Sequence, residues 1–160
     1  MNFWKTVLVC LLGTLDALQA QSYPSRFSPD LPHRPSVAGA LRWIDEQQSN
    51  RVEEWIRVTR IPAPSGKEHD RASYVKDQME KAGLAEVRMD EALNVEGTLR
   101  GSEPGAGIVF TAHTDTVFAA DTPLQVTREH DTLRAPGIFD NSASVVNMLN
   151  AIRALRAANV

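Results

Sequence analysis

The chain has 160 residues, which is enough for one domain and an N-terminal appendage. Its hydrophobic content of 42% and charged content of 23% are typical of a globular protein. The net charge of −3, without a run of Lys or Arg, gives no basis for a nucleic-acid partner. A single cysteine, Cys10, excludes an intrachain disulfide and a zinc site built from cysteines. Any metal must therefore be bound by His, Asp and Glu.

The N-terminus has the layout of a secretory signal peptide over residues 1–20. One positive charge, Lys5, precedes an apolar stretch, and Ala20 offers a small residue at a cleavage point. The stretch is shorter than the roughly 20 apolar residues of a transmembrane helix. We therefore expect export to the periplasm or the extracellular space and no stable membrane anchor. The alternative is a buried or frayed N-terminal helix. Four prolines among polar residues predict an extended linker over residues 21–35.

Three helices are expected after this linker. Ser36 is the expected N-cap of the first helix. The second begins near Asn50 and ends before Pro62. A capping-box pattern, Ser65–Glu68, predicts the start of the third, and Gly83 suits its left-handed C-cap. The apolar residues at helical spacing are Val37, Ala40, Leu41 and Ile44 in the first helix, Val52, Trp55 and Ile56 in the second, and Ala72, Val75, Met79 and Ala82 in the third.

Strands are expected in the middle of the chain. Alternation predicts two strands with one exposed face each, around Val87–Met89 and Asn94–Arg100. Ile108–Phe110 has no polar alternation, which predicts a strand covered on both faces in an α/β sheet. Residues 124–134 predict a further pair of short strands. The last element is an amphipathic helix after residue 142, with Val145, Met148, Leu149, Ile152 and Leu155 on its apolar face.

His113 and Asp115 are the first candidates for a chemical role. His113 follows the buried strand that is expected to end at Thr111, and α/β folds usually place ligands at this end of a strand. Asp115 is two residues later, so both side chains point to the same side of an extended backbone. A carboxylate beside a metal-binding histidine fixes the tautomer of the ring and raises its basicity. The alternative is a solvated polar loop, because this spacing is common.

Asp140 is the third candidate. It lies between the apolar approach Gly137–Phe139 and the last helix. The simplest alternative is that Asp140 or Ser142 caps that helix. A carboxylate at this junction can also bridge two cations, because each of its oxygens can bind one. Together with His113 and Asp115, it indicates metal chemistry.

Three blocks of the sequence, Ile61–Glu68, Thr111–Val117 and Ala135–Asn141, resemble successive blocks of a known enzyme family. This is the zinc-dependent peptidase T, aminoacylase and glutamate carboxypeptidase family of metallopeptidases. The resemblance extends over residues 50–160, in the same order and with similar spacing. It implies a three-layer α/β sandwich and a centre of two Zn²⁺ ions, for which Co²⁺ or Mn²⁺ are alternatives.

The resemblance also implies a role for each candidate residue. His113 would bind one zinc ion, Asp115 would orient His113 and so contribute to catalysis, and Asp140 would bridge both ions. The implied reaction is the hydrolysis of an amide bond in a small peptide or N-acyl amino acid. A homodimer is the expected form of a full-length protein.

The end of the sequence departs from the pattern of this family. Residues 141–160 contain no Asp, Glu or His, so the Glu-Glu pair that supplies a general base and a zinc ligand has no counterpart, and the lid domain is absent. We therefore expect residues 36–160 to be a truncated N-terminal part of a catalytic domain, inactive by itself. Two alternatives stay open: a zinc aminopeptidase of a related di-zinc family, and a non-catalytic fragment or binding module with an incomplete site.

Overall fold

The computed structural model describes residues 28–101 and 107–159. The expected signal peptide and the expected linker as far as residue 27 lie outside these ranges. The segment 102–105, whose Pro and Gly predict a turn, lies outside them as well. Within the remainder of the expected linker, Leu31–His33 forms a short 3-10 helix, η2. The chain is therefore already turning where an extended conformation was expected.

The first two expected helices are present as α2 (Pro35–Glu46) and α3 (Gln48–Thr59). The N-cap of α2 is Arg34, so the prediction of Ser36 was wrong by two residues. Proline suits the first position of a helix, because its missing N–H has no partner there and its φ is already helical. A single residue, Gln47, separates the two helices. α3 ends before Pro62, as the sequence predicted.

The third expected helix is α4 (His69–Lys81), which begins later than the capping box predicted. Its N-cap is Glu68, and the Glu68 carboxylate accepts a hydrogen bond from the backbone N–H of Gly66 at 2.7 Å. The hydroxyl of Ser65 does not cap this helix and instead donates to the carboxylate of Asp115. Gly83 has φ 76°, which confirms the predicted left-handed conformation after the helix.

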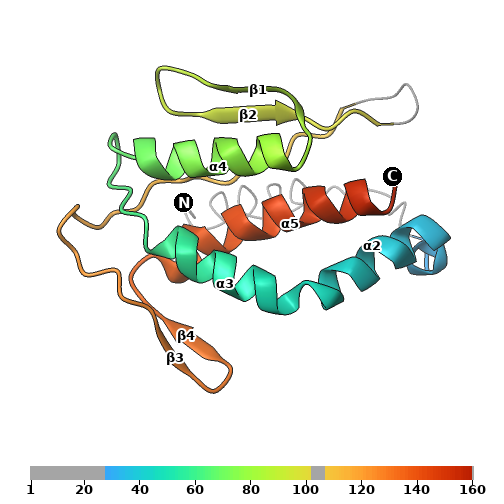
Figure 1. Cartoon of the computed structure of the whole chain (residues 1–160), viewed down its shortest axis with the longest axis horizontal. Coiled ribbons are helices and arrows are strands. Elements are labelled where there is room, and N and C mark those ends of the chain that lie inside the picture. Colours follow the sequence, from blue (N-terminus) through green and yellow to red (C-terminus); the bar gives the residue numbers. More distant parts are fainter. Residues whose placement is uncertain (1–27, 102–106, 160) are drawn as a thin grey trace, which may run out of the picture.

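Two antiparallel hairpins confirm the predicted short strands. β1 (Ala85–Met89) pairs with β2 (Val95–Thr98), with Met89 opposite Val95. β3 (Thr127–Glu129) pairs with β4 (Thr132–Arg134). Burial alternates along β1, as its sequence predicted. The first hairpin lies along α4, whereas the second projects away from the helices (Figure 1).

The prediction of a buried strand at Ile108–Phe110 was wrong. These residues are extended but pair with no strand of the described residues, and Val109 is 85% exposed. A strand forms only where a neighbour accepts its backbone hydrogen bonds, and an apolar run cannot supply that neighbour itself. Further along the chain, Thr116 forms a parallel bridge with Pro64.

The hydrophobic core lies between the helices. α5 (Ser144–Ala157) follows an irregular helical turn, Ile138–Ala143, and runs between α3 and α4 in Figure 1. The buried core residues come from α3, α4 and α5: Val58, Val75, Met79, Val145, Val146 and Leu149. The combination of these helices with two small sheets confirms the α/β class. The three-layer sandwich is not, because neither sheet in the described part of the chain has more than two strands.

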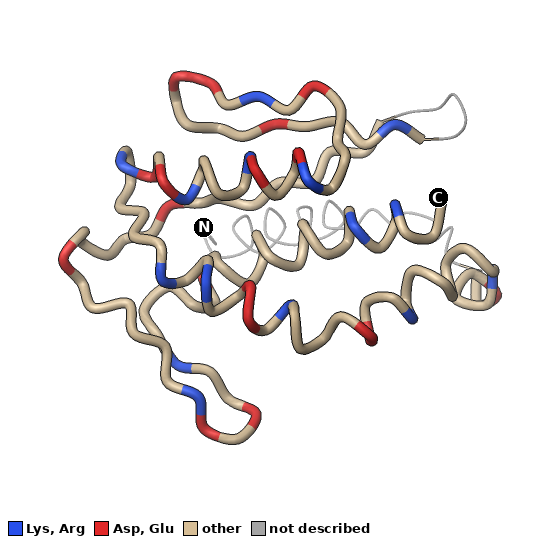
Figure 2. The backbone as a smooth tube through the Cα atoms, in the orientation of Figure 1, with Lys and Arg blue, Asp and Glu red and all other residues tan. Residues whose placement is uncertain are grey.

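Charge follows this arrangement. Acidic and basic residues lie along α3, α4 and both hairpins, whereas α5 carries only Arg153 and Arg156, near its C-terminal end (Figure 2). The first half of α5 is uncharged because it packs into the core. Across residues 28–101 and 107–159, no helix combines the length and the apolar character that crossing a membrane requires.

Candidate metal centre

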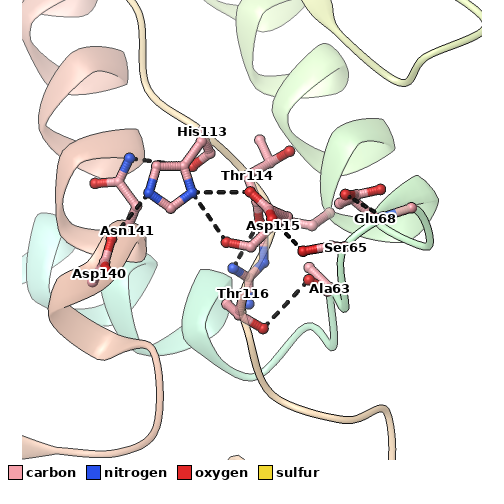
Figure 3. A network of polar contacts seen from close by, with 11 residues as sticks. Ala63, Ser65, Glu68, His113, Thr114, Asp115, Thr116, Asp140 and Asn141 are labelled. Carbon is pink, nitrogen blue, oxygen red and sulfur yellow. Dashed lines mark hydrogen bonds and ion pairs between the residues drawn. The ribbon is translucent and has the colours of Figure 1, made fainter.

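His113 lies between two carboxylates. Its Nδ1 is 3.0 Å from Oδ1 of Asp115, and its Nε2 is 3.0 Å from Oδ1 of Asp140 (Figure 3). The structure therefore brings together the three residues that the sequence singled out. Asp115 and Asp140 contact opposite edges of the imidazole ring, so the three side chains form a row with His113 in the middle.

The backbone of the His113–Asp115 segment is fixed from one side by the loop that follows α3. The Thr116 N–H donates to the carbonyl of Ala63 at 2.7 Å, and the Thr116 hydroxyl donates to the same oxygen at 3.3 Å. Thr116 is buried. Through these bonds, the residues before α4 lie beside the segment that carries the histidine.

Arg71 of α4 joins the same segment to the end of the loop after α3. Its guanidinium donates to the carbonyl of Ile61 from Nε and Nη2, at 3.1 and 2.6 Å, and to the carbonyl of Thr114 from Nη1 at 3.0 Å. Arg71 is 1% exposed, and no carboxylate of the described residues lies within ion-pair distance of it. Burial lowers the pKa of Arg71, and the charge of Asp115 partly opposes this effect.

Asp140 is positioned by the turn that precedes α5. Gly137 has φ 69°, and a Cβ atom at this position would lie 3.1 Å from the side chain of Thr116, so glycine suits both the conformation and the space. The indole N–H of Trp55 donates to the carbonyl of Ile138 at 2.5 Å, which ties the turn to α3. The Asp140–Asn141 peptide bond is cis.

Two further polar groups complete the surroundings of His113. The side-chain amide of Asn141 donates to the carbonyl of His113 at 3.3 Å. The hydroxyl of Ser65 donates to Oδ2 of Asp115 at 2.5 Å, so both oxygens of this carboxylate are engaged. Sequence reasoning missed both residues, together with Arg71 and Trp55. Asn141 directly follows a candidate ligand, which was the only signal available for it, and Ser65 was assigned to a helix cap.

The charges of the row change the protonation of its members. Partial burial by itself lowers the pKa of His113, but the hydrogen bonds to Asp140 and Asp115 together raise it above the usual value. The hydrogen bond from Ser65 lowers the pKa of Asp115, and His113 contributes in the same direction. Asp115 is therefore held as an anion that accepts hydrogen bonds from both neighbours.

The residues present fit a zinc ion in part. Two ligand atoms of a tetrahedral zinc site lie about 3.3 Å apart, so the 3.0 Å between Nε2 of His113 and Oδ1 of Asp140 suits a shared cation. Asp115 occupies the place of the carboxylate that orients a ligating histidine. However, no group of three or more His, Cys, Asp or Glu side chains that could hold a metal ion occurs in the described part of the chain. His113 and Asp140 thus offer two ligands, and Asp115 faces away from the position between them.

Comparison with known families supports metallopeptidase chemistry. Residues 94–160 match the sequence profile of Peptidase family M28, a zinc-dependent metallopeptidase family. The match includes His113, Asp115 and Asp140. The coarser prediction from the sequence, a zinc-dependent metallopeptidase, is therefore supported. The narrower resemblance to the peptidase T and aminoacylase family is not confirmed.

Proposed function

We propose that this chain contributes to the metal centre of a zinc-dependent enzyme that hydrolyses an amide bond in a small peptide or N-acyl amino acid. The observation that carries the proposal is the position of His113, held at 3.0 Å by a carboxylate on each ring nitrogen. The match of residues 94–160 to Peptidase family M28 supports metal-dependent peptide hydrolysis. We further propose that the protein is exported and that two zinc ions occupy the complete centre.

The proposed roles follow from the contacts of each side chain. His113 would ligate zinc through Nε2, because Nδ1 faces Asp115. Asp140 would offer Oδ1 to the same ion and keep its second oxygen for another. Asp115 would accept a hydrogen bond from the Nδ1–H of His113 and so hold the tautomer that leaves Nε2 free. When bound, zinc supplies a Lewis acid that acidifies water and polarises the amide carbonyl.

Neither of the two carboxylates beside His113 is free to act as the general base of this reaction. Asp115 is occupied by Ser65 and His113, and Asp140 belongs to the ligand pair. We therefore propose that the 160-residue chain binds zinc weakly and does not hydrolyse amides by itself. A binding module with an incomplete site is the second candidate. The observation in its favour is that the described residues contain no cluster of three metal ligands.

Zinc binding tests the proposed ligands. We expect competition with a chromophoric chelator to show one weak zinc site in the full chain. His113→Ala and Asp140→Ala should each weaken it by more than the roughly 10- to 100-fold that the loss of an outer hydrogen-bond partner costs. His69→Ala is the matched control, because His69 is an exposed histidine of α4. Equal zinc affinity of the wild type and His113→Ala would contradict the proposal, and tight binding of two ions would show that the site is complete.

Hydrolysis is tested separately with dipeptides and N-acyl amino acids. The zinc-loaded chain is compared with the longer product of its reading frame, where the frame continues. We expect turnover only from the longer product, and we expect His113→Ala to abolish it. A longer product that binds zinc at His113 but hydrolyses no amide would favour the binding module.

A further inference from the structure

Ser65 has a partner that its sequence context does not suggest. It lies in a capping-box pattern directly before α4, yet it does not cap this helix. Its hydroxyl donates instead to Oδ2 of Asp115, fifty residues later in the chain. Figure 3 shows Ser65 and His113 on opposite sides of the Asp115 carboxylate.

This contact depends on two backbone segments that are fixed against each other. The carbonyl of Ala63 accepts two hydrogen bonds from Thr116, and the next residue, Pro64, forms the parallel bridge to Thr116. Ser65 is therefore carried to Asp115 by the backbone, not by a flexible side chain. A hydroxyl has one donor, and here this donor is given to the carboxylate.

An aspartate carboxylate that is hydrogen-bonded at one oxygen only can turn about its Cβ–Cγ bond. In this structure Oδ2 is bonded to Ser65 and Oδ1 faces Nδ1 of His113, so the plane of the carboxylate is defined from both sides. We propose that Ser65 is a positioning residue, which fixes Asp115 so that His113 keeps its Nδ1 proton and presents Nε2 towards Asp140. The expected effect of Ser65 on zinc affinity rests on the proposed function, whereas its effect on the orientation of Asp115 does not.

The test begins without metal, with protein carrying ¹⁵N-labelled histidine. We expect the Nδ1–H proton of His113 to exchange slowly with water in the wild type, because it is bonded to a fixed carboxylate. Ser65→Ala should make this exchange several times faster, and Ser65→Thr, which keeps the hydroxyl, should restore it. Ser49→Ala is the matched control, because Ser49 is an exposed serine of α3. His113→Gln identifies the signal among the four histidines.

Zinc affinity is the second measurement. Loss of a direct partner of a ligating histidine costs about 10- to 100-fold in metal affinity, so loss of Ser65, one bond further away, should cost about 3- to 10-fold. On an Asp115→Ala background, Ser65→Ala should weaken zinc binding no further, because Ser65 acts through Asp115. Ser65 is exposed, so the truncation leaves the core intact, and thermal melting followed by circular dichroism checks this.

The possible results separate the two proposals. Unchanged exchange of the His113 proton in Ser65→Ala would overturn the positioning role, whatever the zinc affinity. An additional loss of affinity on the Asp115→Ala background would overturn it as well. A wild type that binds no zinc would contradict the proposed function alone, because the exchange measurement on the metal-free protein would still decide the role of Ser65.

Discussion

At the scale of single residues, buried polar side chains determine where the candidate ligands lie. Arg71 is the clearest case, since its guanidinium joins the carbonyls of Ile61 and Thr114 and thereby places the loop that carries His113. A residue of this kind gives no signal in the sequence. Arginine on a helix is usually exposed, and only the completed fold shows that its donors replace water at two backbone carbonyls.

Replacement of Arg71 should therefore destabilise the protein, although its side chain bonds to backbone carbonyls and to no candidate ligand side chain. We expect Arg71→Met to lower the free energy of unfolding by about 1–3 kcal/mol, because two carbonyls lose their partners. Arg71→Lys should recover only part of this, since an ammonium group cannot reproduce the geometry of a guanidinium. Urea denaturation measures both variants, with Arg42→Met on the exposed face of α2 as control. Equal stability of Arg71→Lys and the wild type would contradict this account.

At the scale of elements, a polar network inside the helical layer joins α3, α4 and α5. Glu54 of α3 receives two hydrogen bonds from Arg153 of α5, at 2.6 and 2.9 Å, and one from the hydroxyl of Tyr74 of α4 at 3.2 Å. Arg153 also donates to Gln78 at 2.8 Å. Burial, with the charge of Glu54, raises the pKa of Tyr74, and the hydrogen bonds to Glu54 raise the pKa of Arg153. The helices thus share a partly buried ion pair in addition to apolar contacts.

Breaking this pair should cost far more than breaking an exposed one. Arg153→Met leaves the Glu54 carboxylate, 9% exposed, without its cation, and we expect a loss of about 3–5 kcal/mol. Lys81→Met breaks an exposed pair with Asp77 at 2.7 Å and should cost at most about 1 kcal/mol. Thermal and urea unfolding compare the two variants. The double variant Glu54→Leu, Arg153→Met should lose less free energy of unfolding than Arg153→Met alone. If Arg153→Met lost no more than Lys81→Met, the network would be solvated.

At the scale of the whole molecule, an apolar extended segment lies outside the core. Ile108, Val109 and Phe110 are 79%, 85% and 72% exposed, although their sequence has the character of a buried strand. Residues 107–114 contain no charged side chain other than a histidine, and Figure 2 shows no blue or red along this part of the tube. An apolar patch of this kind favours association between molecules.

A charge in this segment should reduce association without loss of stability. We expect Phe110→Lys to change the free energy of unfolding by no more than about 0.5 kcal/mol, because the side chain makes few contacts. Sedimentation velocity should show less self-association than in the wild type. Leu149→Ala, in the centre of the core, is the contrast and should cost about 2–5 kcal/mol. A large loss of stability in Phe110→Lys would show that the segment is buried in solution.

The sequence by itself determined the elements whose signals are local. Periodicity located α2, α3, α4 and α5, alternation located both hairpins, and glycine at position 83 marked the end of α4. These features depend on neighbours within a few residues, so a pattern records them directly. The spacing of His113, Asp115 and Asp140 also indicated that three polar groups belong to one site.

Tertiary structure alone decided what depends on distant partners. It placed His113 between two carboxylates, gave the hydroxyl of Ser65 to Asp115 instead of to a helix, and buried Arg71 and Glu54 in polar contacts. It also left Ile108–Phe110 without a partner among the strands of the described residues. The physical reason is the same in each case: a hydrogen bond or a ladder pair needs a partner at a fixed position. Folding brings Asp140 to His113, Asp115 to Ser65 and Arg153 to Glu54, although these partners lie from 27 to 99 residues apart in the chain.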